Sequence, residues 1–499
     1  MFKKRASGIL LHISSIPTNY GIGDVGPAAH KFVDFLNRSG QNYWQILPLN
    51  YTTAGTAFSP YNCFSAFAGN PLLISPDLLY RDGLLRKNEL QELPDFPTTK
   101  VDYRKASLWK SKLFNKAFAR SGGLSELDNY DQFAEQNKFW LENFATFVAF
   151  KHHLGDRPWS EWPAEIRDRR KHTLVSLKKE LRGKIDRECF LQYIWFKQYS
   201  SLRDKCKENA VTIIGDLPIY VAHDSADVWA HPKVFQLDRS KKPKFIAGVP
   251  PDYFSRTGQL WGNPIYDWQH LGRMDYAWWM QRLGHNLRLY DLLRIDHFRG
   301  LVAYWQVPAG EKTAVRGKWI QAPTEAFFST LFRQFPSAPI FAEDLGYITA
   351  DVREAISKYG FAGMRVLQFG FDGEFTRNPH CPHNHVENCL VYTGTHDNNT
   401  TRGWFETEAT PEQKRSLSDY LGHSVSAKTV HREMTRMAMA SVAKVAIIPM
   451  QDLLGLSAEA RMNRPAKIRG NWLWRMQKGQ ATTALANKLR AMIETYGRI

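Results

Sequence analysis

The stretch LLRIDHFRG, residues 292–300, begins as an apolar run and then places Arg294, Asp296, His297 and Arg299 within six residues. A buried strand has no use for this much charge, because an unpaired ion in a packed core costs several kcal/mol. Either the segment is not a strand, or the strand ends at a site that uses these side chains. The pattern of the rest of the chain favours the second interpretation.

Seven further apolar runs end abruptly in polar residues, at 8–14, 43–49, 211–220, 339–346, 364–372, 389–399 and 443–452. Continuous apolar character without alternation is typical of strands covered on both faces, which indicates a parallel sheet. Helical patterns lie between several of the runs. One places Phe32, Phe35 and Leu36 on a single face and stops at Gly40, and another spans 349–360. Eight such strands with intervening helices predict an α/β fold, a (β/α)8 TIM barrel.

The spacing of the runs is uneven. Roughly 160 residues separate the second run from the third, and roughly 70 separate the third from the fourth. Both gaps follow strand ends, on the barrel face where active sites are built. We interpret residues 1–499 as one catalytic domain with two insertions. The first, at about 50–208, is largely helical, and the second, at about 220–288, is loop-rich and lines a substrate groove.

The charge balance of 66 basic and 49 acidic residues gives +17, which raises the possibility of a polyanion partner. Acidic residues interrupt the basic stretches at 167–172 and 178–184, as on solvated helix faces. Five cysteines at irregular spacing do not suggest a disulfide framework, so a reducing cytoplasm is the expected location. No stretch approaches the roughly 18 apolar residues of a membrane span.

Two short motifs point to other chemistry but lack the context that it requires. A G-x-G-x-x-G pattern at 21–26 is separated from the preceding apolar run by seven residues, and no Asp or Glu occurs between Phe35 and Ser75. A dinucleotide site needs its first glycine directly at the end of the strand and an acidic residue about 20 positions later. Four potential zinc ligands match no common Cys/His array, so no metal site is predicted: Cys381, His383, His385 and Cys389.

Three carboxylates stand where apolar runs end: Asp296, Glu343 and Asp397, in the fourth, fifth and seventh runs. Like charges held together at one barrel mouth raise one another's pKa and reduce stability, so a structural role is hard to assign to the set. Retaining glycoside chemistry needs an ionised nucleophile and a protonated acid about 5 to 5.5 Å apart. Arg294 lies on the same strand face as Asp296 and is expected to keep it ionised, whereas Glu343 is expected to hold its proton.

The segments LLRIDHFRG, IFAEDLG (340–346) and YTGTHDNN (392–399) resemble the catalytic segments of the α-amylase superfamily. Longer motifs narrow this resemblance to the 4-α-glucanotransferases known as amylomaltase or disproportionating enzyme, glycoside hydrolase family 77. They are SPYNCFSAFAGNPLLIS (59–75), GDLPIYVAHDSADVWAHPKVFQLD (215–238), AGVPPDYFSRTGQLWGNPIYDW (247–268) and MQDLLGLSAEARMN (450–463). The resemblance spans residue 8 to about residue 475. The chain departs from the usual family pattern at 12–17, Asn399 and 463–467, and it retains the three carboxylates.

The resemblance implies a role for each candidate site residue. Asp296 would be the nucleophile, Glu343 the general acid/base and Asp397 the stabiliser of the transition state. The segment 248–255 corresponds to a flexible loop over the acceptor side. Eight further residues would contact the glucan: Arg294, His396, Tyr61, Asp216, Asp252, Trp261, Asn263 and Asn463.

The predicted function is therefore transfer of α-1,4-glucan segments between maltooligosaccharides, with no cofactor and no nucleic-acid or membrane partner. Two alternatives stay open on the sequence. One is an amylase-type retaining hydrolase of the same superfamily, and the other is a basic nucleic-acid-binding protein with an inactive barrel. The sequence makes no prediction of the oligomeric state.

Overall fold

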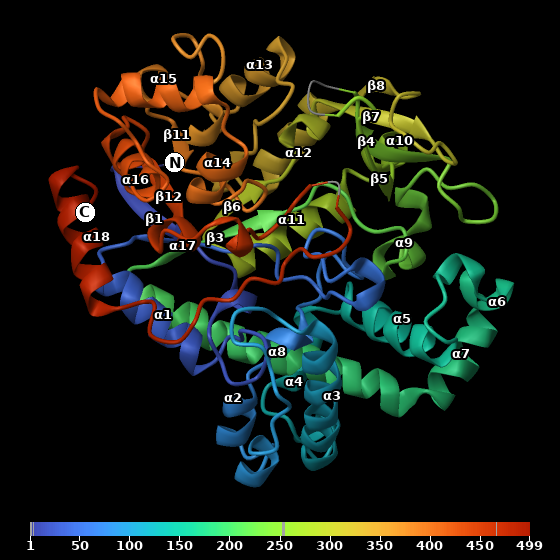
Figure 1. The fold of residues 1–499 in the computed structure, drawn as a ribbon. Coiled ribbons are helices and arrows are strands. Elements are labelled where there is room, and N and C mark those ends of the chain that lie inside the picture. Colours follow the sequence, from blue (N-terminus) through green and yellow to red (C-terminus); the bar gives the residue numbers. More distant parts are fainter. Residues whose placement is uncertain (1, 3, 252–254, 466) are drawn as a thin grey trace.

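The eight apolar runs form eight parallel strands of one sheet in the computed structural model, which describes residues 2, 4–251, 255–465 and 467–499 (Figure 1). The strand order is β10-β11-β12-β1-β2-β3-β6-β9. The two ends of this order meet, because the Ala342 N–H donates to the Ala362 carbonyl at 2.9 Å. The predicted (β/α)8 barrel is confirmed. Its strands are β1 (Ala6–Leu10), β2 (Tyr43–Gln45), β3 (Thr212–Leu217), β6 (Leu292–Ile295), β9 (Ile340–Ala342), β10 (Gly363–Val366), β11 (Cys389–Tyr392) and β12 (Val445–Pro449).

Helices cover the outside of the barrel. The predicted first helix is α1 (Pro27–Arg38), which buries Phe32, Phe35 and Leu36 and is followed by Gly40 at φ +68°. Within the described residues, no helix combines the length and apolar character needed to cross a membrane. The other outer helices are α11 (Ala277–Leu289), α12 (Thr324–Gln334), α13 (Ala350–Lys358), α14 (Thr401–Thr407), α15 (Pro411–Leu421), α16 (Val430–Ala440), α17 (Met450–Leu453) and α18 (Thr483–Thr495).

The chain between β2 and β3 is mainly helical and ends in the long helix α8, which returns to the barrel. In Figure 1 most of these helices lie below the barrel. Helix α5 is buried over most of its length and packs against α8. The helices are α2 (Pro76–Arg81), α3 (Tyr103–Arg120), α4 (Tyr130–Gln136), α5 (Leu141–His153), α6 (Ala164–Arg167), α7 (Lys171–Glu180) and α8 (Arg182–Glu208).

A second sheet, which the sequence did not indicate, lies at the upper right in Figure 1, with the antiparallel order β5-β4-β7-β8. The segment 220–288, predicted to be loop-rich, contributes β4 (Phe245–Val249) and β5 (Gln259–Pro264), together with α9 (Ala226–Ala230) and α10 (Trp268–Arg273). The other two strands are β7 (Ala303–Pro308) and β8 (Lys318–Gln321), which follow β6. Strand β5 is half exposed and lacks an apolar run, so its pairing depends on β4, which in turn pairs with the distant β7.

Strand β3 approaches the ring of Tyr290 closely at Gly215. A Cβ added to Gly215 would lie 2.1 Å from Cγ of Tyr290, closer than packed atoms allow. Tyr290 is buried, and its hydroxyl accepts the N–H of Leu49 at 3.4 Å, so the ring is held from two sides. The absence of a side chain at Gly215 therefore fixes the position of the next residue, Asp216.

We expect Gly215→Ala to lower the free energy of unfolding by about 1–3 kcal/mol, because the added methyl group forces the ring or the strand to move. The matched control is Gly183→Ala in α8, where an added Cβ has no atom within 4 Å. Gly183 is exposed and is the second residue of α8, so its replacement should change the free energy of unfolding by no more than about 0.5 kcal/mol. Urea unfolding of both variants measures the two values. Equal effects would contradict the packing argument.

Candidate active site

Four carboxylates lie at the ends of barrel strands. Asp216 is the penultimate residue of β3, Asp296 follows β6, Glu343 follows β9 and Asp397 lies five residues beyond β11. The strands are parallel, so their carboxyl ends meet at one mouth of the barrel. Burial raises the pKa of Asp296, and the charges of Asp216, Glu343 and Asp397 raise it further, which indicates that these acids lie near it. The predicted trio therefore gathers at one mouth with a fourth acid.

The guanidinium of Arg294 joins two of these acids. Strand pairing sets Arg294 beside Asp216 on the neighbouring strand. Arg294 Nε donates to Asp216 Oδ1 at 2.9 Å, and Nη2 donates to Asp216 Oδ2 at 2.6 Å and to Asp296 Oδ1 at 3.0 Å. The predicted contact between Arg294 and Asp296 is thus present, but the same positive charge is shared with Asp216.

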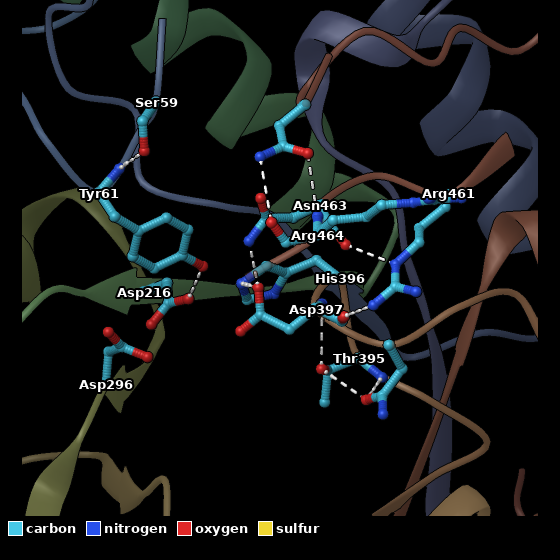
Figure 2. A network of polar contacts seen from close by, with 12 residues as sticks. Ser59, Tyr61, Asp216, Asp296, Thr395, His396, Asp397, Arg461, Asn463 and Arg464 are labelled. Atoms are coloured by element: carbon cyan, nitrogen blue, oxygen red, sulfur yellow. Dashed lines mark hydrogen bonds and ion pairs between the residues drawn. The ribbon is translucent and has the colours of Figure 1, made fainter. Parts of the chain in front are cut away.

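Tyr61, from the segment after β2, closes one side of this group. Its hydroxyl donates to Asp216 Oδ2 at 2.6 Å, and its ring stacks on His396 with 5.0 Å between the ring centroids. Figure 2 shows the hydroxyl directed at Asp216, with Asp296 beside it. Trp472 lies against Tyr61 at 5.7 Å between the ring centroids. Segments from three distant parts of the chain therefore form one aromatic wall.

Asp397 is held by a different set of contacts (Figure 2). Asn463 Nδ2 donates to Asp397 Oδ1 at 2.6 Å, and His396 Nε2 lies 3.4 Å from the same oxygen. The Asn463 N–H donates to the His396 carbonyl at 3.1 Å, and Arg461 Nη2 donates to the Asp397 carbonyl at 2.8 Å. The side chain of Asp397 is 45% exposed, which leaves its carboxylate open to a ligand.

Backbone N–H groups hold the carboxyl of Glu343. The His297 N–H donates to Oε2 at 2.8 Å and the Leu345 N–H donates to Oε1 at 2.7 Å. His297 adopts the left-handed conformation, with φ +49°, which is uncommon for a residue other than glycine. The residue that directly follows Asp296 thus contacts the second acid through its main chain.

Burial raises the pKa of Glu343 to about 7, while Arg294 and the two N–H donors lower it. Burial also raises the pKa of Asp296, with Asp216, Glu343 and Asp397 acting in the same direction and Arg294 opposing them. Carboxyls that raise each other's pKa titrate as a group and retain a proton that isolated carboxyls would lose. The site therefore holds charged and protonated carboxyls together near neutral pH.

Of the three remaining predicted groove residues, the structure describes Trp261 and Asn263. Trp261 is 36% exposed and sets its ring edge-on to His297, with 4.8 Å between the ring centroids. Asn263 donates through Nδ2 to the Val221 carbonyl at 2.9 Å, so its amide nitrogen is committed to the backbone. Asp252 lies outside the described residues.

Sequence reasoning missed His12, which lies at the end of β1. Burial and the nearby His396 lower the pKa of His12 to about 3, so the ring is neutral. Its Nδ1 accepts the N–H of Leu47 at 3.3 Å. A pocket partly open to solvent is lined by His12, His396, Asn399 and Arg461 among others. The signal was available, because His12 ends the first apolar run as Asp296 ends the fourth.

The four potential zinc ligands of the sequence each have other partners in the structure. Among the described residues, no three His, Cys, Asp or Glu side chains are grouped so that they could hold a metal ion. Cys381 donates to the Gly370 carbonyl, Cys389 donates to the Val386 carbonyl, and His385 contacts the Ser441 hydroxyl. His383 contacts Tyr420.

A family model for glycoside hydrolase family 77, described as 4-alpha-glucanotransferase, matches residues 11–482. The chain belongs to family 77. The 4-alpha-glucanotransferase of Aquifex aeolicus is 42% identical over 494 residues, which cover 99% of each chain. The enzyme of the same name from Synechocystis is 44% identical over 504 residues, covering 100% of this chain and 99% of the relative.

Solved structures agree with the family 77 assignment. The amylomaltase from Streptococcus agalactiae in complex with acarbose matches with a TM-score of 0.95 and 38% identity, covering 99% of this chain and 100% of that chain. The amylomaltase from Corynebacterium glutamicum matches with a TM-score of 0.79 at 17% identity, covering 99% of this chain and 75% of that chain, and supports the fold alone. The predicted family and enzyme class, 4-α-glucanotransferase, are confirmed.

The raised pKa of Glu343 predicts a pH-dependent effect of Glu343→Gln on stability. The wild-type carboxyl resists ionisation in the folded state. Its contribution to the free energy of unfolding is therefore full below pH 4.5 and is lost as the pH rises through about 7. The variant has no such loss. Relative to wild type, its free energy of unfolding should therefore increase by up to about 3 kcal/mol between pH 4.5 and pH 8.

Urea unfolding of the wild type and Glu343→Gln across this pH range tests the expectation. The amide also disturbs one of the two N–H contacts, but that cost does not vary with pH and cancels in the comparison. A constant difference between the two proteins would show that the pKa of Glu343 is not raised in the folded state.

Proposed function

We propose that this chain moves α-1,4-glucan segments from one maltooligosaccharide to the 4-hydroxyl of another through a covalent glycosyl-enzyme intermediate. The observation that carries the proposal is the meeting of four carboxyls around Arg294 at the barrel mouth, in a chain that belongs to family 77. Membership of this family favours transfer over the amylase-type alternative, because the family is described as 4-alpha-glucanotransferase.

In the proposed first step, Asp296 attacks the anomeric carbon of the donor while the bond to the leaving 4-oxygen breaks. Glu343 gives its proton to that oxygen, and the donor remains as a glycosyl ester on Asp296. The direct contact with Arg294 favours negative charge on Asp296, against burial and the neighbouring acids, which raise its pKa. Glu343, with its pKa near 7, then carries the proton.

In the second step, the 4-hydroxyl of an acceptor glucan attacks the anomeric carbon and loses its proton to Glu343. The ester bond breaks, and Asp296 is regenerated as a carboxylate. Asp397, fixed by Asn463 and His396, would stabilise the positive charge that develops on the sugar ring in both steps. Every proton and bond of the first step is thereby restored, so the reaction needs no cofactor.

The other contacts would hold the sugar rings. Arg294, Asp216, Tyr61 and His396 form the wall next to Asp296, where they would bind the glucose unit being transferred. Trp261, Asn263 and Asn463 would contact neighbouring units along the groove. The exposed ring of Trp261 offers a flat apolar surface of the kind on which sugar rings stack. An acceptor bound there would exclude water from the ester, which favours transfer over hydrolysis.

The domain interpretation and the location belong to the same proposal. We propose one catalytic domain, 1–499, in which the insertions at about 50–208 and 220–288 supply Tyr61 and Trp261 to the groove. All five cysteines lie in the described part of the chain and are free and buried, which supports a reducing compartment such as the cytoplasm.

Incubation with maltotriose tests the activity. Transfer should give glucose together with a ladder of longer oligosaccharides, which chromatography of the products resolves. Products that are all shorter than the substrate would establish the hydrolase instead, and no turnover of maltotriose or longer glucans would overturn the proposed function.

Asp296→Asn should reduce turnover by at least about 1,000-fold, because the amide cannot form the glycosyl ester. The matched control is Asp291→Asn, at the opposite end of β6. Asp291 pairs with Arg203 at 2.8 Å and accepts the N–H of Ile213 at 2.9 Å, far from the mouth in strand direction. Its variant should retain turnover within about twofold.

Rates with maltotriose and circular dichroism spectra of both variants complete this test. A folded Asp296→Asn protein with near-normal turnover would remove Asp296 from the proposed role. Equal losses in both variants would indicate damage to β6 in place of a lost nucleophile.

A further inference from the structure

An ion pair outside the sugar-facing wall reaches two residues of the site. Arg461 Nη1 donates to Glu408 Oε1 at 2.7 Å, Nη2 donates to the Asp397 carbonyl at 2.8 Å, and Nε donates to the Asn463 carbonyl at 2.7 Å. One rigid guanidinium thus contacts both Asp397 and the residue that donates to its carboxylate (Figure 2). Any tilt of Arg461 moves both.

Glu408 fixes the outer side of Arg461. It directly follows α14, and its Oε1 accepts a second hydrogen bond, from Asn399 Nδ2 at 2.9 Å. Asn399 is buried, and its carbonyl accepts from Gln368 Nε2 at 2.9 Å. The carboxylate of Glu408 therefore lies between a cation and a neutral amide that both donate to it.

The charges around Arg461 explain why the carboxylate of Glu408 is needed to hold its guanidinium in place. Arg464 lies near Arg461 and opposes its charge, whereas Glu408 and Asp397 favour it. Without Glu408, the guanidinium would lose its anchor on one side and face a like charge nearby. An acid at position 399 would point a second carboxylate at Glu408, where the amide now donates a hydrogen bond.

We propose that Glu408 is a positioning residue for glucan transfer, which acts through Arg461 to hold Asp397 and Asn463 in their working arrangement. This inference rests on the proposed role of Asp397. Asn399 is the neutral partner that donates a hydrogen bond to Glu408 beside Arg461. Arg461 contacts Asp397 at the main-chain carbonyl of Asp397, not at its carboxylate.

A purely structural role for Glu408 would predict a loss of stability on its removal, whereas the positioning role predicts a loss of turnover. The side chain of Glu408 is 43% exposed, and ion pairs in that environment contribute little to stability. Removal of Glu408 should therefore change turnover more than it changes unfolding, because small displacements of a group that acts in the transition state reduce kcat strongly.

We expect Glu408→Ala to lower kcat with maltotriose about 10-fold and to leave KM within about twofold, with an unchanged urea midpoint. Glu408→Gln, which keeps the acceptor oxygen without the charge, should lie between Glu408→Ala and wild type. The control is Glu406→Ala. Glu406 lies in α14, two residues before Glu408, and pairs with Arg402 at 2.8 Å, so its removal should leave kcat unchanged.

A charge swap between positions 399 and 408 supplies a second readout. Asn399→Asp should lower kcat increasingly as the pH rises, since repulsion requires both acids to be ionised. The double variant Asn399→Asp/Glu408→Gln restores one carboxylate and one amide, and should recover kcat to within about threefold of wild type with no such pH dependence.

The inference is overturned if Glu408→Ala keeps kcat within twofold of wild type, or if the double variant is no more active than Asn399→Asp. A loss of kcat that matches an equal loss of stability would likewise reject positioning in favour of a structural role. A wild-type protein that fails to extend maltotriose would overturn the proposed function itself, and with it the role of Asp397 on which this inference depends.

Discussion

The site depends on the buried guanidinium of Arg294. Asp216 and Asp296 come from adjacent parallel strands, and Arg294 bonds to both, so its charge is divided between them. Taking carboxylates out of water is costly unless a partner compensates for the lost hydration, and removal of one member of such a pair costs about 3–5 kcal/mol. The strand register that sets Arg294 beside Asp216 is therefore as necessary to the site as the acids themselves. The charge of Arg294 also lowers the pKa of Glu343, against the burial that raises it.

The barrel and its principal acids could be predicted from the sequence for a simple physical reason. Strands covered on both faces are apolar throughout, so the point where each strand leaves the core is marked by an abrupt polar residue. Asp296, Glu343 and Asp397 carry this mark, as does His12, which was seen at the end of a run but given no role. Tyr61 and Asn463 carry no such mark. They lie in irregular segments, and their assignment came from the resemblance to family 77 alone.

The remaining features depend on contacts between distant segments. Strand β5 has a half-exposed sequence, and its pairing with β4 is completed by strands that follow β6, so no local pattern reveals the second sheet. The division of Arg294 between two acids was also hidden, because it requires the register of β3 against β6. Arg461 and Glu408 are 53 residues apart, and charged residues at such a separation look like ordinary surface residues until the fold unites them.

The left-handed turn at His297 joins the two central acids by covalent geometry. Asp296 and the N–H that bonds to Glu343 belong to consecutive residues, so one peptide bond and one hydrogen bond link the main chain of the proposed nucleophile to the carboxyl of the proposed acid. The position of Glu343 relative to Asp296 therefore depends on this hydrogen bond and on the backbone conformation of His297. Loops and side chains around the groove can therefore change without altering this turn. A one-residue insertion at the turn, in contrast, would separate Asp296 from the N–H that bonds to Glu343.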